Sequence, residues 1–169
     1  KQLIWRLCEM STYKDKLNWC LANNNRMQKI KPNKKLSQDH LLKAKHNLKA
    51  SNYNIQGGFS DWGVSQAYYA MYHSLLAILF RLGYESKNHE CTINAVEFLI
   101  EERMISLDLK DIAFIRTTQQ MTTKDAKSLR EEFQYGTQTS VDEELLHALL
   151  QNSKEFVERV ELSLNALSV

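Results

Sequence analysis

The sequence predicts an all-α fold, an up-and-down bundle of about five to six helices with an added N-terminal helix. Two observations lead to this prediction. The 169 residues include only five glycines and one proline, too few turn residues for a sandwich or barrel of many short strands. Apolar residues also recur every three to four positions along most of the chain, and strict alternation of apolar and polar residues, typical of strands, does not persist anywhere.

The first 35 residues are predicted to form an N-terminal helix and a basic linker, and residues 36–169 to form the bundle. Apolar residues in 2–22 follow the spacing of one helical stripe, which Ser11 and Thr12 weaken in the middle. Lysines around Pro32 then mark the linker.

The next two helices lie between clear start and stop signals. Ser37 is predicted to cap the first of them, which stops at Gly57 and Gly58. The other starts near residues 60–61 and runs to Gly83, a residue that commonly ends helices. Its apolar residues extend around most of the helix surface, so we expect this helix to lie centrally.

Three more helices are expected towards the C-terminus. One covers about 91–103, and another runs from about Asp108 towards Tyr135 with a kink near Thr122. The last opens with a capping box at residues 140–143.

The charge of the chain is unevenly distributed. The 22 basic and 20 acidic residues give a formal net charge of +2, but residues 26–50 hold eight basic residues and one acidic residue. Residues 101–169 hold eight basic and 13 acidic residues. The basic stretch can attract a polyanion or an acidic partner, or it can be a lysine-rich helix face in contact with water.

Cysteine usage and hydropathy suggest a cytoplasmic protein without a membrane anchor. Cys8, Cys20 and Cys91 are odd in number and widely spaced, which does not suggest a secreted disulfide framework or a tetrahedral zinc site. The longest apolar run, residues 67–80, is shorter than the roughly 20 residues that a membrane span needs. No signal-peptide block is visible at the start of the sequence.

No metal or cofactor is predicted. The sequence lacks a glycine-rich phosphate loop, a His-Glu-x-x-His motif and the paired Glu-x-x-His motifs of di-iron bundles. The short cluster at residues 88–91 contains His89 but has no second set of ligands at helical spacing.

Two polar groups of residues remain as candidates for a site. Tyr69, Tyr72 and His73 share one side of the third helix, either as a hydrogen-bonded core network or as the lining of a cleft for a base or phosphate. Arg130 stands between Leu129 and Phe133, near a helix end. An arginine placed in this way can bind a phosphate with two hydrogen bonds or pair with a carboxylate.

Residues 61–73, Gly83, residues 87–89 and residues 129–136 together resemble HEPN domains (higher eukaryotes and prokaryotes nucleotide-binding), especially the small stand-alone prokaryotic members. The resemblance covers residues 36–164. It implies a helical bundle that commonly forms a homodimer with a cleft between protomers. It also implies a minimal nucleotidyltransferase as partner, in a pair that acts as toxin and antitoxin.

The toxins of such pairs are often metal-independent endoribonucleases with a motif of Arg, four to six residues and His. No arginine in this chain has a histidine at that distance, and Arg130 is followed after four residues by Tyr135. A phenol, with a pKa of about 10, is a poor general base at neutral pH. The sequence therefore leaves enzymatic activity open.

Three hypotheses result. The first is a dimeric nucleotide- or RNA-binding regulatory module, with a site formed by the residues Arg130, Tyr135, Tyr69, Tyr72, His73 and His89. The second is an endoribonuclease toxin in which Arg130 acts with His73 or His89. The third is a helical scaffold that binds only other proteins.

Overall fold

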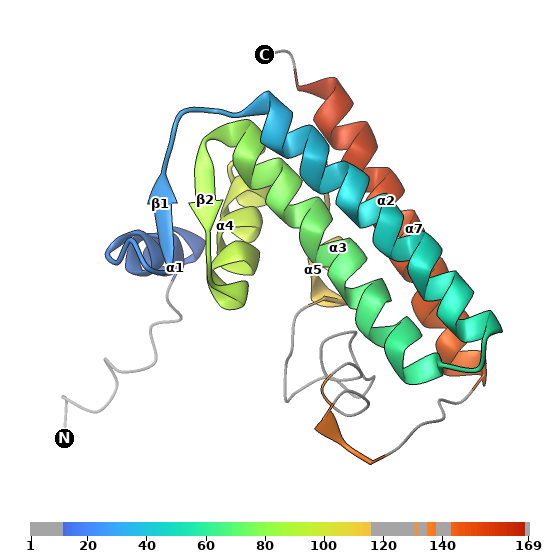
Figure 1. Ribbon diagram of the computed structural model, residues 1–169. Helices are drawn as coiled ribbons and strands as arrows, with labels where there is room; N and C mark the ends of the chain where they lie inside the picture. The colour runs from blue at the N-terminus through green and yellow to red at the C-terminus, as the bar shows by residue number, and fades with distance from the viewer. Residues whose placement is uncertain (1–11, 116–130, 132–134, 138–142, 168–169) are drawn as a thin grey trace, which may run out of the picture.

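The computed structural model describes residues 12–115, 131, 135–137 and 143–167 (Figure 1). The predicted all-α fold is confirmed, with one small sheet in addition. In chain order the elements are α1 (Tyr13–Leu21), β1 (Met27–Lys29), α2 (Lys34–Gln56), α3 (Ser60–Leu82), β2 (Tyr84–Ser86), α4 (His89–Glu101), α5 (Leu109–Ala113) and α7 (Glu143–Ala166).

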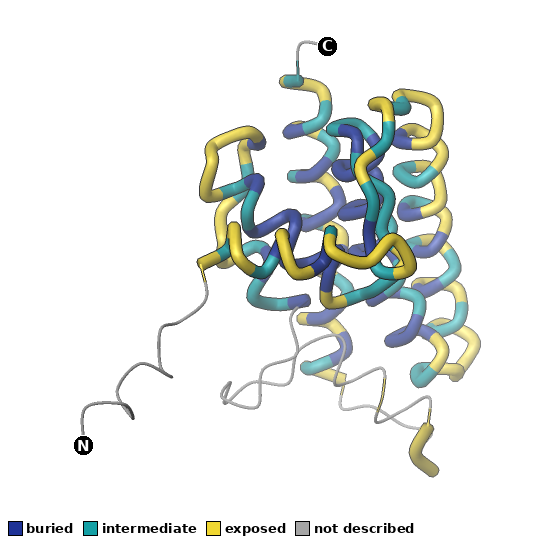
Figure 2. The backbone as a smooth tube through the Cα atoms, turned by 90° about the vertical axis from the view of Figure 1, so that its left-hand side faces the viewer, coloured by how far each residue is buried: buried dark blue, intermediate teal, exposed yellow. Residues whose placement is uncertain are grey.

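Helix α3 lies at the centre of the molecule, as its apolar surface predicts. It packs against α2, α7, α4 and β2, and most of its residues from Gly63 to Phe80 are buried. Figure 1 shows α2, α3 and α7 side by side, with α1, β1 and α4 at the other side of the molecule. In Figure 2 the buried positions lie on the inward sides of the helices and the exposed positions on their outward sides.

The hairpin of α2 and α3 packs closely because Gly63 has no side chain. A Cβ atom at Gly63 would lie 2.5 Å from Cγ1 of Ile55. The Ser51 hydroxyl donates a hydrogen bond of 2.7 Å to the Gly63 carbonyl at this point. At the other end of α3, Gly83 adopts φ 84°, the left-handed conformation that a glycine accepts readily after a helix.

The N-terminal part is joined to the bundle by a sheet and a disulfide. Strand β1 pairs antiparallel with β2, with Met27 opposite Ser86 and Lys29 opposite Tyr84. Cys20 in α1 and Cys91 in α4 form a disulfide. Neither feature was predicted from the sequence, because three-residue strands are too short to show alternation, and cysteines 71 residues apart in sequence become neighbours only in the fold.

Several helix ends differ from the predicted ones. Asn33 caps α2 in place of Ser37, whose hydroxyl is buried and donates to the Ala77 carbonyl at 2.7 Å. Asn88 caps α4, which begins at residue 89. The helix expected from Asp108 towards Tyr135 ends at Ala113, and residues 116–130 lie outside the described part.

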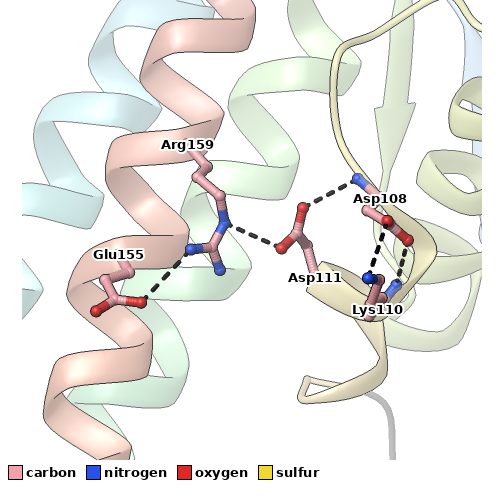
Figure 3. Close-up of polar contacts among 5 residues, drawn as sticks. All are labelled: Asp108, Lys110, Asp111, Glu155 and Arg159. Atoms are coloured by element: carbon pink, nitrogen blue, oxygen red, sulfur yellow. Dashed lines mark hydrogen bonds and ion pairs between the residues drawn. The ribbon is translucent and has the colours of Figure 1, made fainter.

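Helix α5 is attached to α7 by charged side chains (Figure 3). Nε of Arg159 lies 2.9 Å from Oδ1 of Asp111, and a second nitrogen of Arg159 lies 3.6 Å from Glu155. Asp108 caps the helix and accepts from the Lys110 backbone N–H at 3.1 Å. These contacts place the start of the segment that leads to Arg130 beside α7.

No helix in the described ranges combines the length and the apolar character that a membrane-spanning helix needs.

Candidate functional site

A group of aromatic and imidazole rings lies where α2, α3 and the start of α4 meet. We call it the tyrosine–histidine cluster, and it consists of His40 in α2, Tyr68, Tyr69, Tyr72 and His73 in α3, and His89 at the start of α4. The structure therefore brings together four of the predicted site residues: Tyr69, Tyr72, His73 and His89. The rings of these four residues and of Tyr68 are connected by ring contacts.

His89 is held by two tyrosines from α3. Its ring stacks on the ring of Tyr72, with centroids 4.1 Å apart and an interplanar angle of 6°. The Tyr68 hydroxyl lies 2.6 Å from Nδ1 of His89. Because Asn88 caps α4 through the Cys91 backbone N–H, the first residue of that helix is fixed against α3. His89 is thus a positioned imidazole and not a loose surface side chain.

Tyr72 belongs to a hydrogen-bonded core network, one of the two interpretations given above for the polar residues of the third helix. Its side chain is 8% exposed, and its hydroxyl lies 3.2 Å from the Thr92 hydroxyl. Burial raises the pKa of Tyr72, so its phenol is protonated at neutral pH and can donate a hydrogen bond. Tyr69 is more accessible, since it is only partly buried and packs edge-on against Tyr68 at 5.5 Å.

His73 faces a second histidine across the α2–α3 interface. Nδ1 of His73 and Nδ1 of His40 are 2.9 Å apart, so one nitrogen donates and the other accepts. The His40 ring also stacks on Phe80, with centroids 5.0 Å apart. Burial, with the charges of His40 and Lys43, lowers the pKa of His73 to about 4. Burial lowers the pKa of His40 as well, so the pair is neutral at pH 7.

This histidine pair predicts a pH-dependent stability. A histidine whose folded pKa lies below its unfolded value of about 6.5 favours the folded state at high pH. For His73 that contribution is complete above pH 6.5 and is lost as the pH falls towards 4. Because the side chain is only half buried, we expect the free energy of unfolding to fall by about 1–2 kcal/mol over this range.

Urea unfolding at pH 7.0 and pH 4.5 measures the effect, with His73→Gln as the matched variant. The variant should lose less stability than the parent between the two pH values, since glutamine does not titrate. An equal loss in both proteins would contradict the prediction.

His40 was missed from the sequence, although a signal for it exists. The face of α2 that packs on α3 carries small or polar residues at helical spacing, namely Ser37, His40, Ala44, Asn47 and Ser51, four of them buried. Such a stripe on an otherwise charged helix indicates a close helix contact. The apolar periodicity of α2 indicates its leucines and does not indicate His40.

The second predicted group of residues is only partly described. Arg130 lies outside the described residues, and Tyr135 is described with a side chain that is 74% exposed. Over the described ranges, no group of three or more histidine, cysteine, aspartate or glutamate side chains is arranged to hold a metal ion.

Comparison with known proteins identifies the family. The HEPN domain family model matches residues 37–163 of the chain. A protein of Archaeoglobus fulgidus, described as a UPF0332 protein, is 30% identical over 125 residues, which cover 74% of this chain and 92% of the relative. The family-model match begins in α2 and ends in α7, and it includes every residue of the tyrosine–histidine cluster. This chain belongs to the HEPN domain family.

Proposed function

We propose that the chain is a nucleotide- or RNA-binding regulatory module whose site is the accessible side of the tyrosine–histidine cluster. Tyr69 and His73 are partly exposed on neighbouring turns of α3. Lys43, exposed on α2, is close enough to lower the pKa of His73. Flat rings beside a cation suit a nucleotide, since bases stack on aromatic side chains and phosphates attract ammonium groups.

The partly exposed rings of Tyr69 and His73, held in place by their ring contacts, carry this proposal. A neutral imidazole can offer one hydrogen-bond donor or acceptor to a base edge, and its flat face adds stacking area. His89 is held by Tyr68 and Tyr72, so we assign it a positioning role. Arg130 and Tyr135 are proposed to contact phosphate, as the family resemblance implies.

Binding of ATP, GTP and a fluorescein-labelled 12-nucleotide RNA tests this proposal, by thermal shift and fluorescence anisotropy. We expect Tyr69→Leu and Lys43→Ala to weaken binding roughly tenfold each, the usual effect of losing one stacking or charged contact. Arg130→Ala should weaken it at least as much. Lys110→Ala is the matched control, because Lys110 is exposed on α5, away from the cluster, and should bind like the parent.

Failure to bind any of the three probes would favour the scaffold hypothesis. The same RNA incubated in EDTA tests the endoribonuclease alternative. Cleavage by the parent that is absent in Arg130→Ala would replace the binding proposal with an enzymatic one.

We also propose that the chain acts as a homodimer and that its partner is a minimal nucleotidyltransferase in a toxin–antitoxin pair. The family membership and the uneven charge support this proposal. The identity of the adjacent gene, followed by co-purification of the two products, tests it. An unrelated neighbour and no co-purification would contradict it.

A further inference from the structure

Helix α1 and strand β1 precede the part of the chain that the HEPN domain family model matches, which begins at residue 37. This added segment is basic, because residues 12–31 hold five basic residues and one acidic residue. Helix α1 packs against α4, and the Cys20–Cys91 disulfide joins the two helices. A basic surface is therefore held at a fixed place beside α4 (Figure 1).

A tryptophan of α1 is exposed on this surface. The Trp19 residue is 56% exposed, and the guanidinium carbon of Arg26 lies 3.7 Å from the centre of its ring. Trp19 directly precedes Cys20, so the disulfide fixes this end of α1. An exposed indole that is held by a stacked cation offers a flat, ordered surface to a second ring.

A cavity of about 310 Å³ opens beside this ring, and it is lined by Asp15, Lys16, Trp19 and Asn94. We call these four residues the α1/α4 site. Arg26 does not line the cavity, so the cavity meets the indole away from the guanidinium. Asn94 is only 5% exposed and supplies a polar wall from α4. A cavity of this volume lies at the lower end of the range for small-molecule sites.

The α1/α4 site is separate from the tyrosine–histidine cluster. His89, the first residue of α4, stacks on Tyr72 of α3. Asn94 instead lines the cavity together with residues of α1. Cys91, three positions before Asn94 and on the same side of α4, is bonded to Cys20 of α1. A ligand in the cavity therefore contacts α1 and α4 and leaves the rings of the cluster free.

The charges around the cavity favour an anionic ligand. In the described part of the chain, neither Lys16 nor Arg26 forms an ion pair, and Nε of Arg26 is buried without a hydrogen-bond partner. Asp15 brings a carboxylate, whose Oδ2 accepts from the Thr12 hydroxyl at 2.7 Å and from its backbone N–H at 3.1 Å. These hydrogen bonds lower the pKa of Asp15, so its side chain is an acceptor at neutral pH.

We propose that the α1/α4 site binds a nucleoside phosphate with its base stacked on Trp19. The Asn94 amide carries both donors and an acceptor for the edge of the base. Lys16 and Arg26 attract the phosphate, and Asp15 accepts from the ribose hydroxyls. A free nucleotide and one nucleotide of an RNA strand present the same chemistry. Binding here is independent of binding at the tyrosine–histidine cluster.

The fluorescence of Trp19 tests this proposal. Trp5→Phe combined with Trp62→Phe leaves Trp19 as the one tryptophan of the chain. ATP, GTP and the 12-nucleotide RNA without its label are titrated into this variant, and we expect saturable quenching because the base stacks on the indole. Adding Lys16→Ala should raise the dissociation constant roughly tenfold. Lys14→Ala is the matched control, since this lysine of α1 is exposed but does not line the cavity.

The same titrations separate the two sources of the nucleotide. A lower dissociation constant for ATP or GTP than for the RNA assigns the site to a free nucleotide, and the reverse order assigns it to a strand. Inorganic triphosphate, which has no base, should leave the fluorescence unchanged. Equal quenching by inorganic triphosphate, or no quenching by any of the three probes, would overturn the proposal.

Calorimetric titration with the tightest probe distinguishes this site from the cluster. Trp19→Leu should remove the binding and Trp19→Phe should keep most of it, with circular dichroism showing that both variants fold as the parent does. Tyr69→Leu, added to the variant with Trp19 alone, should leave the quenching unchanged, even if the cluster binds nothing. Loss of the quenching in that Tyr69 variant, or equal binding by Trp19→Leu and the parent, would contradict the α1/α4 site and not the cluster.

Discussion

Reduction of the Cys20–Cys91 disulfide is expected to lower the free energy of unfolding by about 4 kcal/mol. The bond closes a loop across 71 positions of sequence, and a cross-link over such a distance removes much of the conformational entropy of the unfolded chain. Both cysteines are fully buried, so the link also fixes α1 to α4 inside the packed core. Guanidinium unfolding with and without a reductant measures the difference.

Cysteine variants separate the loss of stability caused by breaking the disulfide from other effects of the reductant. Cys20→Ser and Cys91→Ser should each reproduce it in oxidising buffer, and neither variant should respond further to reductant. Cys8→Ser is the matched control and should respond to reductant as the parent does. Three free thiols in the unreduced, denatured parent would contradict the prediction directly.

Tyr68→Ala is expected to lower the free energy of unfolding by about 4 kcal/mol, as is typical when a buried aromatic ring is truncated. Tyr68 is fully buried in α3, where its ring packs against Tyr69 and stacks near Tyr72. Its hydroxyl is also hydrogen-bonded to His89. Truncation therefore leaves a cavity in the core and removes a support of the cluster.

Tyr68→Phe separates these two contributions. It keeps the ring and removes only the hydroxyl, so we expect a loss of about 1 kcal/mol. The NMR chemical shifts of the His89 ring should change in this variant, whereas Tyr69→Phe, at a partly exposed position, should leave them nearly unchanged. A loss below 1 kcal/mol in Tyr68→Ala would show that Tyr68 is not a core residue.

Much of the fold could be predicted because its signals are local. Gly58 and Gly83 adopt the left-handed conformation that glycine accepts readily, and the structure places the ends of α2 and α3 at Gly57 and Gly83. The apolar surface of α3 surrounds most of the helix and required a central position. The motif residues on α3 carried the family resemblance, which the HEPN domain match confirms.

Other features depend on contacts between distant segments. Strands β1 and β2 are three residues each, and neither has a pattern that could be recognised alone. Each is stabilised by hydrogen bonds to the other strand, which lies more than 50 residues away. The N-cap of α2 also depends on a distant contact. Asn33 caps the helix in place of the predicted Ser37, whose hydroxyl is hydrogen-bonded to α3.

In the candidate site, too, some features follow from local spacing and others depend on contacts between distant segments. Spacing along one helix predicted that Tyr69, Tyr72 and His73 lie together, and this needed only helical geometry. The His40–His73 pair and the stack of His89 on Tyr72 needed three helices to meet. Tyr135 is exposed, and the position of Arg130 lies outside the described residues, so the association of the two predicted groups stays a prediction.

The sequence by itself determined the helices, the central place of α3 and the family, because helical periodicity and turn residues act over a few positions. The tertiary structure decided which side chains became partners: Cys20 with Cys91, His40 with His73, and β1 with β2. It also lowers the pKa values of His40 and His73, because both side chains are partly buried between helices. Burial and long-range contact are properties of the packed chain, and no local pattern specifies them.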